Sequence, residues 1–478
     1  MKTNHKMIKA PCLSVCFVCP ILLLGVAGHA GMAQSPGTFT VTGSLITPRA
    51  GHTATLLLNG KVLITGGIPY DWPDVPLLAS AELYDPSIRA FTATGDMTRG
   101  RAQHTVTLLP DGRVLITGAL MDLSAEVYDA ATGSFTTTGN MVAHPYPGQA
   151  NTLLQNGKVF IAAYPTAQLY DPITGTFAAT GPYAAPAPAI LERSTLLADG
   201  RVLLTGAVNV CYLPQCRDPG AGWTELYDPT EGTFSITGGM KWWNTVYTAT
   251  LLTSGKVLFA GNDNYNGIPS AAELYDPSDG TFTRIASLPP SPTYSAATLL
   301  PDDTVLITGG FLTGQAISEL YMPASNTFSA AGNLITAGTS TLLPDGMVLI
   351  AGGSSAELYH PAVLVSAPLL FSLSGDGRGQ GAIWHAATGQ IVSQGAPAAA
   401  GEILSMYTTS LGHGSVIPPQ VAIGGRLAEI LYFGSAPGYP GFNQVNFRMP
   451  SGITPGSTVP VRLTYLGRPS NEVTIAIQ

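Results

Sequence analysis

The fold of this chain is decided by a short stretch that reads HTVTLL (104–109), PDG (110–112) and RVLITG (113–118). Two apolar runs rich in β-branched residues flank a tight turn with Asp-Gly at its tip, which is typical of a β-hairpin. The stretch therefore predicts two antiparallel strands joined by a short connection.

The same hairpin pattern recurs seven times along the chain. Each copy has two leucines, a short polar turn and a Val-rich run. The equivalent valines are Val62, Val114, Val159, Val202, Val257, Val305 and Val348. They are 43 to 55 residues apart, which is the spacing of β-propeller repeats. We therefore predict seven blades.

A third and a fourth strand follow each hairpin. The third strand carries Glu-Leu-Tyr-Asp or a variant, and its tyrosines are Tyr84, Tyr128, Tyr170, Tyr227, Tyr275, Tyr321 and Tyr359. The fourth strand carries Thr-Phe or a variant, and its phenylalanines are Phe91, Phe135, Phe177, Phe234, Phe282 and Phe328. We expect both sets to pack between neighbouring blades.

The seventh Thr-Phe unit lies at the other end of the repeat region, in residues 37–43 around Phe39. We predict that this N-terminal segment is the outer strand of the last blade and closes the ring, because an open ring would expose unpaired sheet edges. Residues 37–363 are therefore predicted to form an all-β, seven-bladed β-propeller.

The repeats resemble kelch-repeat propellers, particularly the divergent type that forms the body of galactose oxidase. The Gly-Gly pair after the second strand is complete at Gly66-Gly67, Gly309-Gly310 and Gly352-Gly353. The resemblance covers about 325 residues and implies the fold. It also raises an alternative function, that of a copper radical oxidase.

That oxidase family uses a Tyr-His pair just before the hairpin of a late blade, a second tyrosine, a histidine from the C-terminal domain and a cysteine joined to a tyrosine. Tyr359-His360 falls in a third strand instead, and residues 337–340 before the last hairpin offer no ligand. His413 is the plausible C-terminal histidine besides His385. We therefore expect no cofactor, no metal site and no catalytic residue, and keep the oxidase as the alternative.

Residues 368–478 lack the repeat and contain short alternating runs, which predict an Ig-like β-sandwich. The phrases GQGAI (379–383), SAPGYPGFNQVNFRMP (435–450) and PGSTVPVRLTYLGRPSNEVTIAIQ (455–478) resemble the Solibacter C-terminal domain of secreted acidobacterial proteins. The resemblance implies export and carries no activity. Trp384 and His385 depart from that family's usual small or polar residues, and we assign no site to them.

Residues 1–33 read as a secretory signal peptide, with Lys2, Lys6 and Lys9 before an apolar run and small residues at its end. An uncleaved anchor and a lipoprotein signal are the alternatives. Export predicts a secreted protein and an oxidising compartment, where Cys211 and Cys216 would form a local disulfide rather than a redox pair.

The composition excludes several classes of protein. With 10% charged and 45% hydrophobic residues, the chain is too apolar for a disordered protein. A net charge of −8 argues against a nucleic-acid partner, and the apolar runs are too short for stable membrane insertion after signal cleavage.

The loops between second and third strands, and those that link blades, vary in length and share one face of the propeller. This variable face collects most of the aromatic loop residues, and loops on a rigid scaffold commonly bind ligands. The predicted ligand-binding residues are Tyr70, Trp72, Tyr212, Arg217, Trp223, Trp242, Trp243 and Tyr265. Aromatic planes beside polar groups suit sugar rings or peptide side chains.

We therefore predict a secreted, non-catalytic binding or scaffold protein with a carbohydrate or protein ligand. The alternative is that these aromatic residues plug the channel or cover sheet edges. His52 and His104 recur at one position of successive repeats, which favours a packing or hydrogen-bonding role over metal ligation. A calcium site over Asn262–Asn266 is a further, weaker hypothesis because oxygen ligands cluster there.

Overall fold

The computed structural model describes residues 37–69, 76–118, 122–144, 151–163, 165–184, 189–208, 222–240, 245–263, 268–288, 294–310, 316–412 and 414–478. These residues form strands, turns and loops, with no helix among them. In particular, they include no helix with the length and hydrophobicity to cross a membrane.

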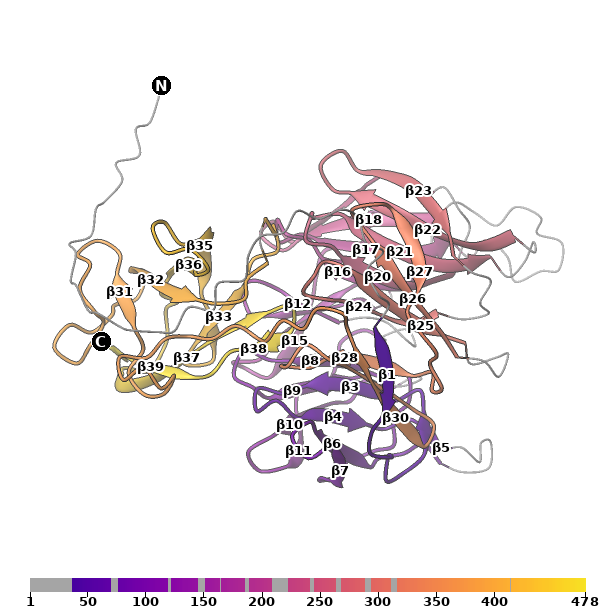
Figure 1. The fold of residues 1–478 in the computed structure, drawn as a ribbon, viewed down its shortest axis with the longest axis horizontal. Coiled ribbons are helices and arrows are strands. Elements are labelled where there is room, and N and C mark those ends of the chain that lie inside the picture. The colour runs from indigo at the N-terminus through magenta and orange to yellow at the C-terminus, as the bar shows by residue number, and fades with distance from the viewer. Residues whose placement is uncertain are drawn as a thin grey trace.

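Seven four-stranded antiparallel sheets make a ring of blades (Figure 1). Blade 1 consists of β3 (Thr53–Leu56), β4 (Val62–Thr65), β6 (Ala81–Asp85) and β7 (Ala90–Ala93). Blade 2 consists of β8 (Thr105–Leu108), β9 (Val114–Thr117), β10 (Ala125–Asp129) and β11 (Ser134–Thr137). Blade 3 consists of β12 (Asn151–Leu153), β13 (Val159–Ile161), β14 (Gln168–Asp171) and β15 (Thr176–Ala179). Blades 4 and 5 are β16 (Ala189–Leu196), β17 (Val202–Val208), β18 (Gly222–Asp228) and β19 (Thr233–Ile236); and β20 (Thr245–Leu251), β21 (Val257–Asp263), β22 (Ile268–Asp276) and β23 (Thr281–Ser287).

Blade 6 is β24 (Tyr294–Leu299), β25 (Val305–Gly309), β26 (Ile317–Met322) and β27 (Thr327–Ala330). Blade 7 is β28 (Thr339–Leu342), β29 (Val348–Gly352), β30 (Ser355–His360) and β1 (Thr38–Val41). A two-stranded ribbon of β2 (Arg49–Ala50) and β5 (Ile68–Pro69) adjoins blade 1.

One cross-strand ladder repeats in every blade. A leucine of the first strand faces a valine of the second, which faces the tyrosine of the third, which faces the phenylalanine of the fourth. In blade 2 this ladder is Leu108–Val114–Tyr128–Phe135. The shared register explains why the sequence repeats at these four positions, because a slip of one residue would turn the buried set outward.

The ring closes as predicted, through the N-terminal strand. β1 pairs antiparallel with β30, and Phe39 faces Tyr359. Thr42, just after β1, then hydrogen-bonds the Tyr84 hydroxyl of blade 1 at 2.8 Å. The prediction of an all-β propeller followed by a β-sandwich is therefore confirmed.

The tyrosines and phenylalanines pack between blades, as expected. The seven third-strand tyrosines are fully buried, and their ring centroids lie 4.7 to 5.1 Å from those of the paired phenylalanines. Several of their hydroxyls bond a threonine of the preceding blade, as Tyr128 does with Thr94 at 2.9 Å. Tyr84, Tyr128, Tyr170 and Tyr275 therefore join two blades through both ring and hydroxyl, whereas the Tyr321 hydroxyl donates to Asn326 of its own blade.

The C-terminal segment folds into two packed sheets beside the propeller (Figure 1). One sheet has the order β31 (Ile383–His385), β32 (Ile403–Thr408), β36 (Asn443–Arg448) and β35 (Glu429–Ser435). The other has β34 (Arg426–Leu427), β33 (Gln420–Ile423), β37 (Gly456–Tyr465) and β38 (Arg468–Pro469), with β39 (Val473–Ile477) paired to β37. One apolar core lies between them.

Candidate ligand-binding cavity

A ring of leucines surrounds the channel at the centre of the propeller. Every innermost strand ends in a leucine that is followed directly by a second leucine, and the two have different environments. The second leucine is buried between blades, as Leu109 and Leu154 are. The first leucines line the mouth of a cavity and are Leu56, Leu108, Leu153, Leu196, Leu251, Leu299 and Leu342. The repeat therefore builds an apolar collar at one end of the channel.

A ring of threonines accompanies the leucine collar. The residue before the first leucine is threonine in all seven blades: Thr55, Thr107, Thr152, Thr195, Thr250, Thr298 and Thr341. Hydroxyl pairs link neighbouring inner strands, with Thr152 to Ser194 at 2.8 Å and Thr298 to Ser340 at 2.6 Å. Each inner strand is also a sheet edge, whose backbone N–H and C=O groups on that side have no strand partner. Of these threonines, Thr55, Thr107, Thr298 and Thr341 line the cavity, and the hydroxyl oxygens of Thr107 and Thr341 are buried.

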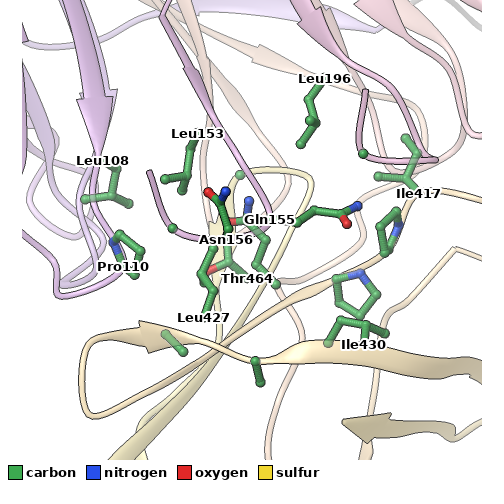
Figure 2. Close-up of a pocket in the computed structure, with 18 of the residues that line it drawn as sticks. Leu108, Pro110, Leu153, Gln155, Asn156, Leu196, Ile417, Leu427, Ile430 and Thr464 are labelled. Atoms are coloured by element: carbon green, nitrogen blue, oxygen red, sulfur yellow. The ribbon is translucent and has the colours of Figure 1, made fainter. Parts of the chain in front are cut away.

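The C-terminal sandwich faces this end of the channel and forms with it an open cavity of about 2050 Å³. Figure 2 shows its two walls. Gln155 and Asn156, in the hairpin turn of blade 3, lie on the propeller side, while Leu427, Ile430 and Thr464 lie on the sandwich side. The backbone N–H of Val416 donates to the Thr253 carbonyl at 2.9 Å, which fixes the two walls to each other.

Most charged side chains at the cavity have a counter-ion. Lys158 pairs with Asp171 at 3.4 Å and Arg201 with Asp199 at 2.7 Å, both in the propeller turns. On the sandwich side Arg448 pairs with Glu429 at 2.9 Å and Arg462 with Glu472 at 3.1 Å. The cavity therefore has a largely ion-paired rim around a lining of leucines with several hydroxyl and amide side chains.

The two histidines of the repeat join neighbouring blades. His52 Nε2 lies 3.2 Å from the Thr339 hydroxyl of blade 7. His104 Nε2 lies 3.1 and 2.9 Å from the hydroxyls of Thr53 and Thr65 of blade 1. Both side chains are buried, and the hydrogen-bonding role expected of them is confirmed.

Burial keeps both imidazoles neutral. Desolvation, with the charge of Arg49 added, lowers the pKa of His52 to about 4. Desolvation, with the charges of Arg101 and His52 added, lowers the pKa of His104 to about 3. Neutral, hydroxyl-bonded imidazoles hold the blades together and are not exposed to a substrate.

A buried ion pair in each of blades 1 and 2 was not predicted from the sequence. Arg49 donates to Glu82 at 2.6 Å, and Glu82 also accepts the backbone N–H groups of Ile46 and Thr47. Arg101 and Glu126 repeat the ion pair at 3.0 Å. A sequence signal for these ion pairs was present. Both repeats contain Arg-x-x-His, followed in the third strand by the glutamate of Glu-Leu-Tyr or Glu-Val-Tyr. These carboxylates brace the linkers between blades.

The ligand-binding residues predicted from the sequence mostly lie outside the described residues. These are Tyr70, Trp72, Tyr212, Arg217, Trp242, Trp243 and Tyr265, together with Cys211, Cys216 and the candidate copper ligand His413. The backbone of Trp223 lies in β18 opposite Gly206. Of the residues proposed to bind calcium, Asn262 lies in β21, while residues 264–266 are outside the described part of the chain. All these assignments stay predictions.

The cavity lies at the face that carries the tight hairpin turns, and the variable face lies at the opposite end of the channel. The hairpin turns reach the cavity through Pro110, Gln155 and Gly200. The Thr-Leu-Leu sequence that all seven blades share was the sequence signal for the propeller wall of this cavity. The second wall could not be found in this way because it comes from a domain outside the repeat.

No protein-family model matches this chain, and no curated protein matches it either. Among solved structures, it is similar to a fungal alcohol oxidase of the AA5 family in complex with copper. The two share 16% sequence identity with a TM-score of 0.54, over 93% of this chain and 99% of the other. This likeness supports the galactose oxidase-like propeller fold; the resemblance to the Solibacter domain stays a prediction.

Tyr359 and His360, the Tyr-His pair of the described residues, do not fit the copper site of that oxidase family. No group of three or more histidine, cysteine, aspartate or glutamate side chains placed to hold a metal ion occurs in the described part of the chain, although the oxidase ligand set also uses tyrosines and His413 lies outside that part. Tyr359 is buried between blades, and burial raises the pKa of its phenol, which opposes the phenolate that a metal would need. His360 beside it bonds the Thr40 hydroxyl at 2.8 Å.

Proposed function

We propose that this chain is an exported, non-catalytic binding protein that holds an uncharged carbohydrate in the cavity between propeller and sandwich. One observation carries the proposal: the cavity combines a leucine collar with hydroxyl and amide groups, while the charges at its rim are mostly paired. Sugars present apolar C–H faces and many hydroxyls, and binding sites for small molecules commonly pair an apolar wall with a few polar groups.

The titratable groups of the described propeller support a non-catalytic role. Shifted pKa values mark catalytic sites when the group also reaches a substrate. Here His52 and His104 have lowered pKa values because they are buried between blades, and their Nε2 atoms are engaged by threonine hydroxyls. Glu82 and Glu126 are likewise engaged by buried arginines. These groups stabilise the ring and have no opening to act on a ligand.

Gln155 offers a direct test of the cavity. Its side chain is exposed on the propeller wall, and its amide has no hydrogen-bond partner among the described residues. A glycan array of the chain from residue 34 onward would identify the ligand, and calorimetry would measure its affinity. We expect Gln155→Ala to weaken binding about tenfold, as the loss of one good hydrogen bond does. The matched control Gln390→Ala, an exposed glutamine of the sandwich, should leave affinity unchanged.

An array with no bound glycan, or equal affinity of Gln155→Ala and the unaltered chain, would refute the cavity proposal. The variable face needs its own test. If it binds a ligand, Trp242→Ala should weaken binding without lowering the melting temperature, and loss of stability instead would assign that tryptophan a packing role.

A copper radical oxidase remains the second candidate, because the structural neighbour is an alcohol oxidase in complex with copper. Metal analysis after copper reconstitution separates the two. The binding proposal predicts less than one tightly held copper per chain, and a single tightly held copper with alcohol-dependent oxygen consumption would establish the oxidase.

A further inference from the structure

Aromatic and amide side chains gather on the outer side of the β31–β32–β36–β35 sheet. Along β32 the side chains alternate, so that Leu404 and Met406 are buried while Ser405 and Tyr407 face outward. The register sets Trp384 opposite Ser405, Ser405 opposite Asn446, and Tyr407 opposite Gln444. Together with Tyr439 these residues form a surface that we call the aromatic face, which consists of Trp384, Ser405, Tyr407, Tyr439, Gln444 and Asn446.

Three rings of the aromatic face form a row. The Trp384 and Tyr407 centroids are 5.4 Å apart and those of Tyr407 and Tyr439 are 5.5 Å apart. Tyr439 is 57% exposed. A second pair, Phe371 and Phe442, lies 5.4 Å apart and is also exposed. Clusters of large aromatic side chains exposed to solvent are more typical of a binding surface than of a contribution to stability.

The polar atoms beside this row are uncharged and incompletely paired. Gln444 Nε2 donates to Asn446 Oδ1 at 2.9 Å and to Ser405 Oγ at 3.3 Å. This arrangement leaves Gln444 Oε1 and Asn446 Nδ2 without a partner in the described part of the chain. One acceptor and one donor, on partly exposed side chains of the central strand β36, thus lie on the side of the sheet that carries the rings.

The strand that carries Trp384 is firmly fixed. The neighbouring His385 points to the buried side, where its Nδ1 lies 2.5 Å from Glu402 Oε1 and its Nε2 lies 2.9 Å from the Ala396 carbonyl. Binding to a rigid aromatic surface costs little side-chain entropy. The face is therefore pre-organised.

We propose that the aromatic face binds a single chain of a neutral polysaccharide, with β-linked pyranose units in contact with Trp384, Tyr407 and Tyr439. Ring faces contact the apolar C–H faces of sugars, and Gln444 and Asn446 exchange hydrogen bonds with their hydroxyls. No side chain of the face is charged, which disfavours nucleic acids and acidic glycans because their anions require cationic partners. The ring planes are inclined by 70° and 57°, so they suit a twisting soluble chain rather than a flat crystal surface. This site is separate from the propeller cavity.

The test uses the chain from residue 34 onward in affinity gel electrophoresis against hydroxyethyl cellulose, soluble xylan, glycol chitin and a soluble β-1,3-glucan. We expect retardation by at least one of them. Trp384→Ala and Gln444→Ala should each weaken it about tenfold with unchanged melting temperature, while Trp384→Phe retains most of the affinity. Ile335→Ala, an exposed apolar residue of the propeller, is the matched control.

Absence of retardation by all four polymers would overturn the proposal, as would equal retardation of both alanine variants and the unaltered chain. A change of oligomeric state in Trp384→Ala, seen by light scattering, would also overturn it by assigning the face to a second copy of the chain. Gln155→Ala leaves the aromatic face intact, so failure of the cavity proposal would not remove this retardation.

Discussion

Replacement of His104 tests how the blades are held together. The imidazole is 4% exposed, and burial with the nearby charges of Arg101 and His52 lowers its pKa to about 3. In the unfolded chain the same group has its ordinary value of 6.5. Between these values the unfolded state binds a proton that the folded state does not, so stability must fall as the pH falls below about 6.5.

The size of this effect follows from the linkage relation. At pH 5 the unfolded state is almost fully protonated at this site and the folded state is almost fully neutral. The free energy of unfolding should then be about 2 kcal/mol lower than at pH 8 through His104 alone. At pH 5 this loss of free energy depends little on the exact pKa of His104 in the folded state, because any pKa well below 5 leaves the imidazole neutral. His52, with a folded pKa of about 4, adds a similar loss.

Urea unfolding at pH 5 and pH 8 measures the effect in the unaltered chain and in His104→Gln. The difference between the two pH values should be about 2 kcal/mol smaller in the variant, because its amide does not titrate. Thr53→Val is the matched control, since it removes a hydroxyl bonded to His104 and keeps the imidazole. It should cost about 1 kcal/mol at both pH values. An unchanged pH dependence in His104→Gln would refute the assignment of a buried, neutral imidazole.

Three further predictions concern stability. Arg101→Ala leaves the Glu126 carboxylate buried without its ion pair and should lower the free energy of unfolding in urea by about 3 to 5 kcal/mol; a loss below 1 kcal/mol would contradict the pairing. Deletion of residues 37–43 removes the partner of β30 and should lower the melting temperature and promote aggregation, measured by calorimetry and light scattering, whereas an unchanged melting curve would show that β1 does not close the ring. Tyr84→Phe removes the hydrogen bond to Thr42 and should cost about 1 kcal/mol in urea, with no cost expected if the hydroxyl is solvated instead.

The propeller could be predicted because its information is periodic. Seven copies of one Leu–Val–Tyr–Phe ladder are enough to give strand order and register, since each position has one side-chain environment in all blades. Closure was predictable for the same reason, because Phe39 is the seventh member of a set with six members elsewhere. Periodic positions can be compared with each other even when only one sequence is known.

The two proposed binding surfaces could not be predicted in this way because they depend on contacts outside the repeat. Gln155 becomes a cavity residue only because Leu427 and Ile430 of the sandwich lie across from it. Trp384 was assigned no site from the sequence, since its ring neighbour Tyr407 and the next ring of the row, Tyr439, are 23 and 55 positions away. Sheet register brings Trp384 and Tyr407 together, and the β35–β36 loop adds Tyr439.

Seven-fold repetition also limits what the propeller alone can recognise. Equivalent leucines and threonines around the channel present nearly the same environment in every direction, so they can add affinity without fixing the orientation of a ligand. Orientation requires groups that break the symmetry. At the cavity these are Gln155 in a single blade and the sandwich residues Ile417, Leu427 and Thr464. If the cavity binds a ligand as proposed, its selectivity should therefore depend on Gln155 and the C-terminal domain together, while the seven-fold collar adds affinity.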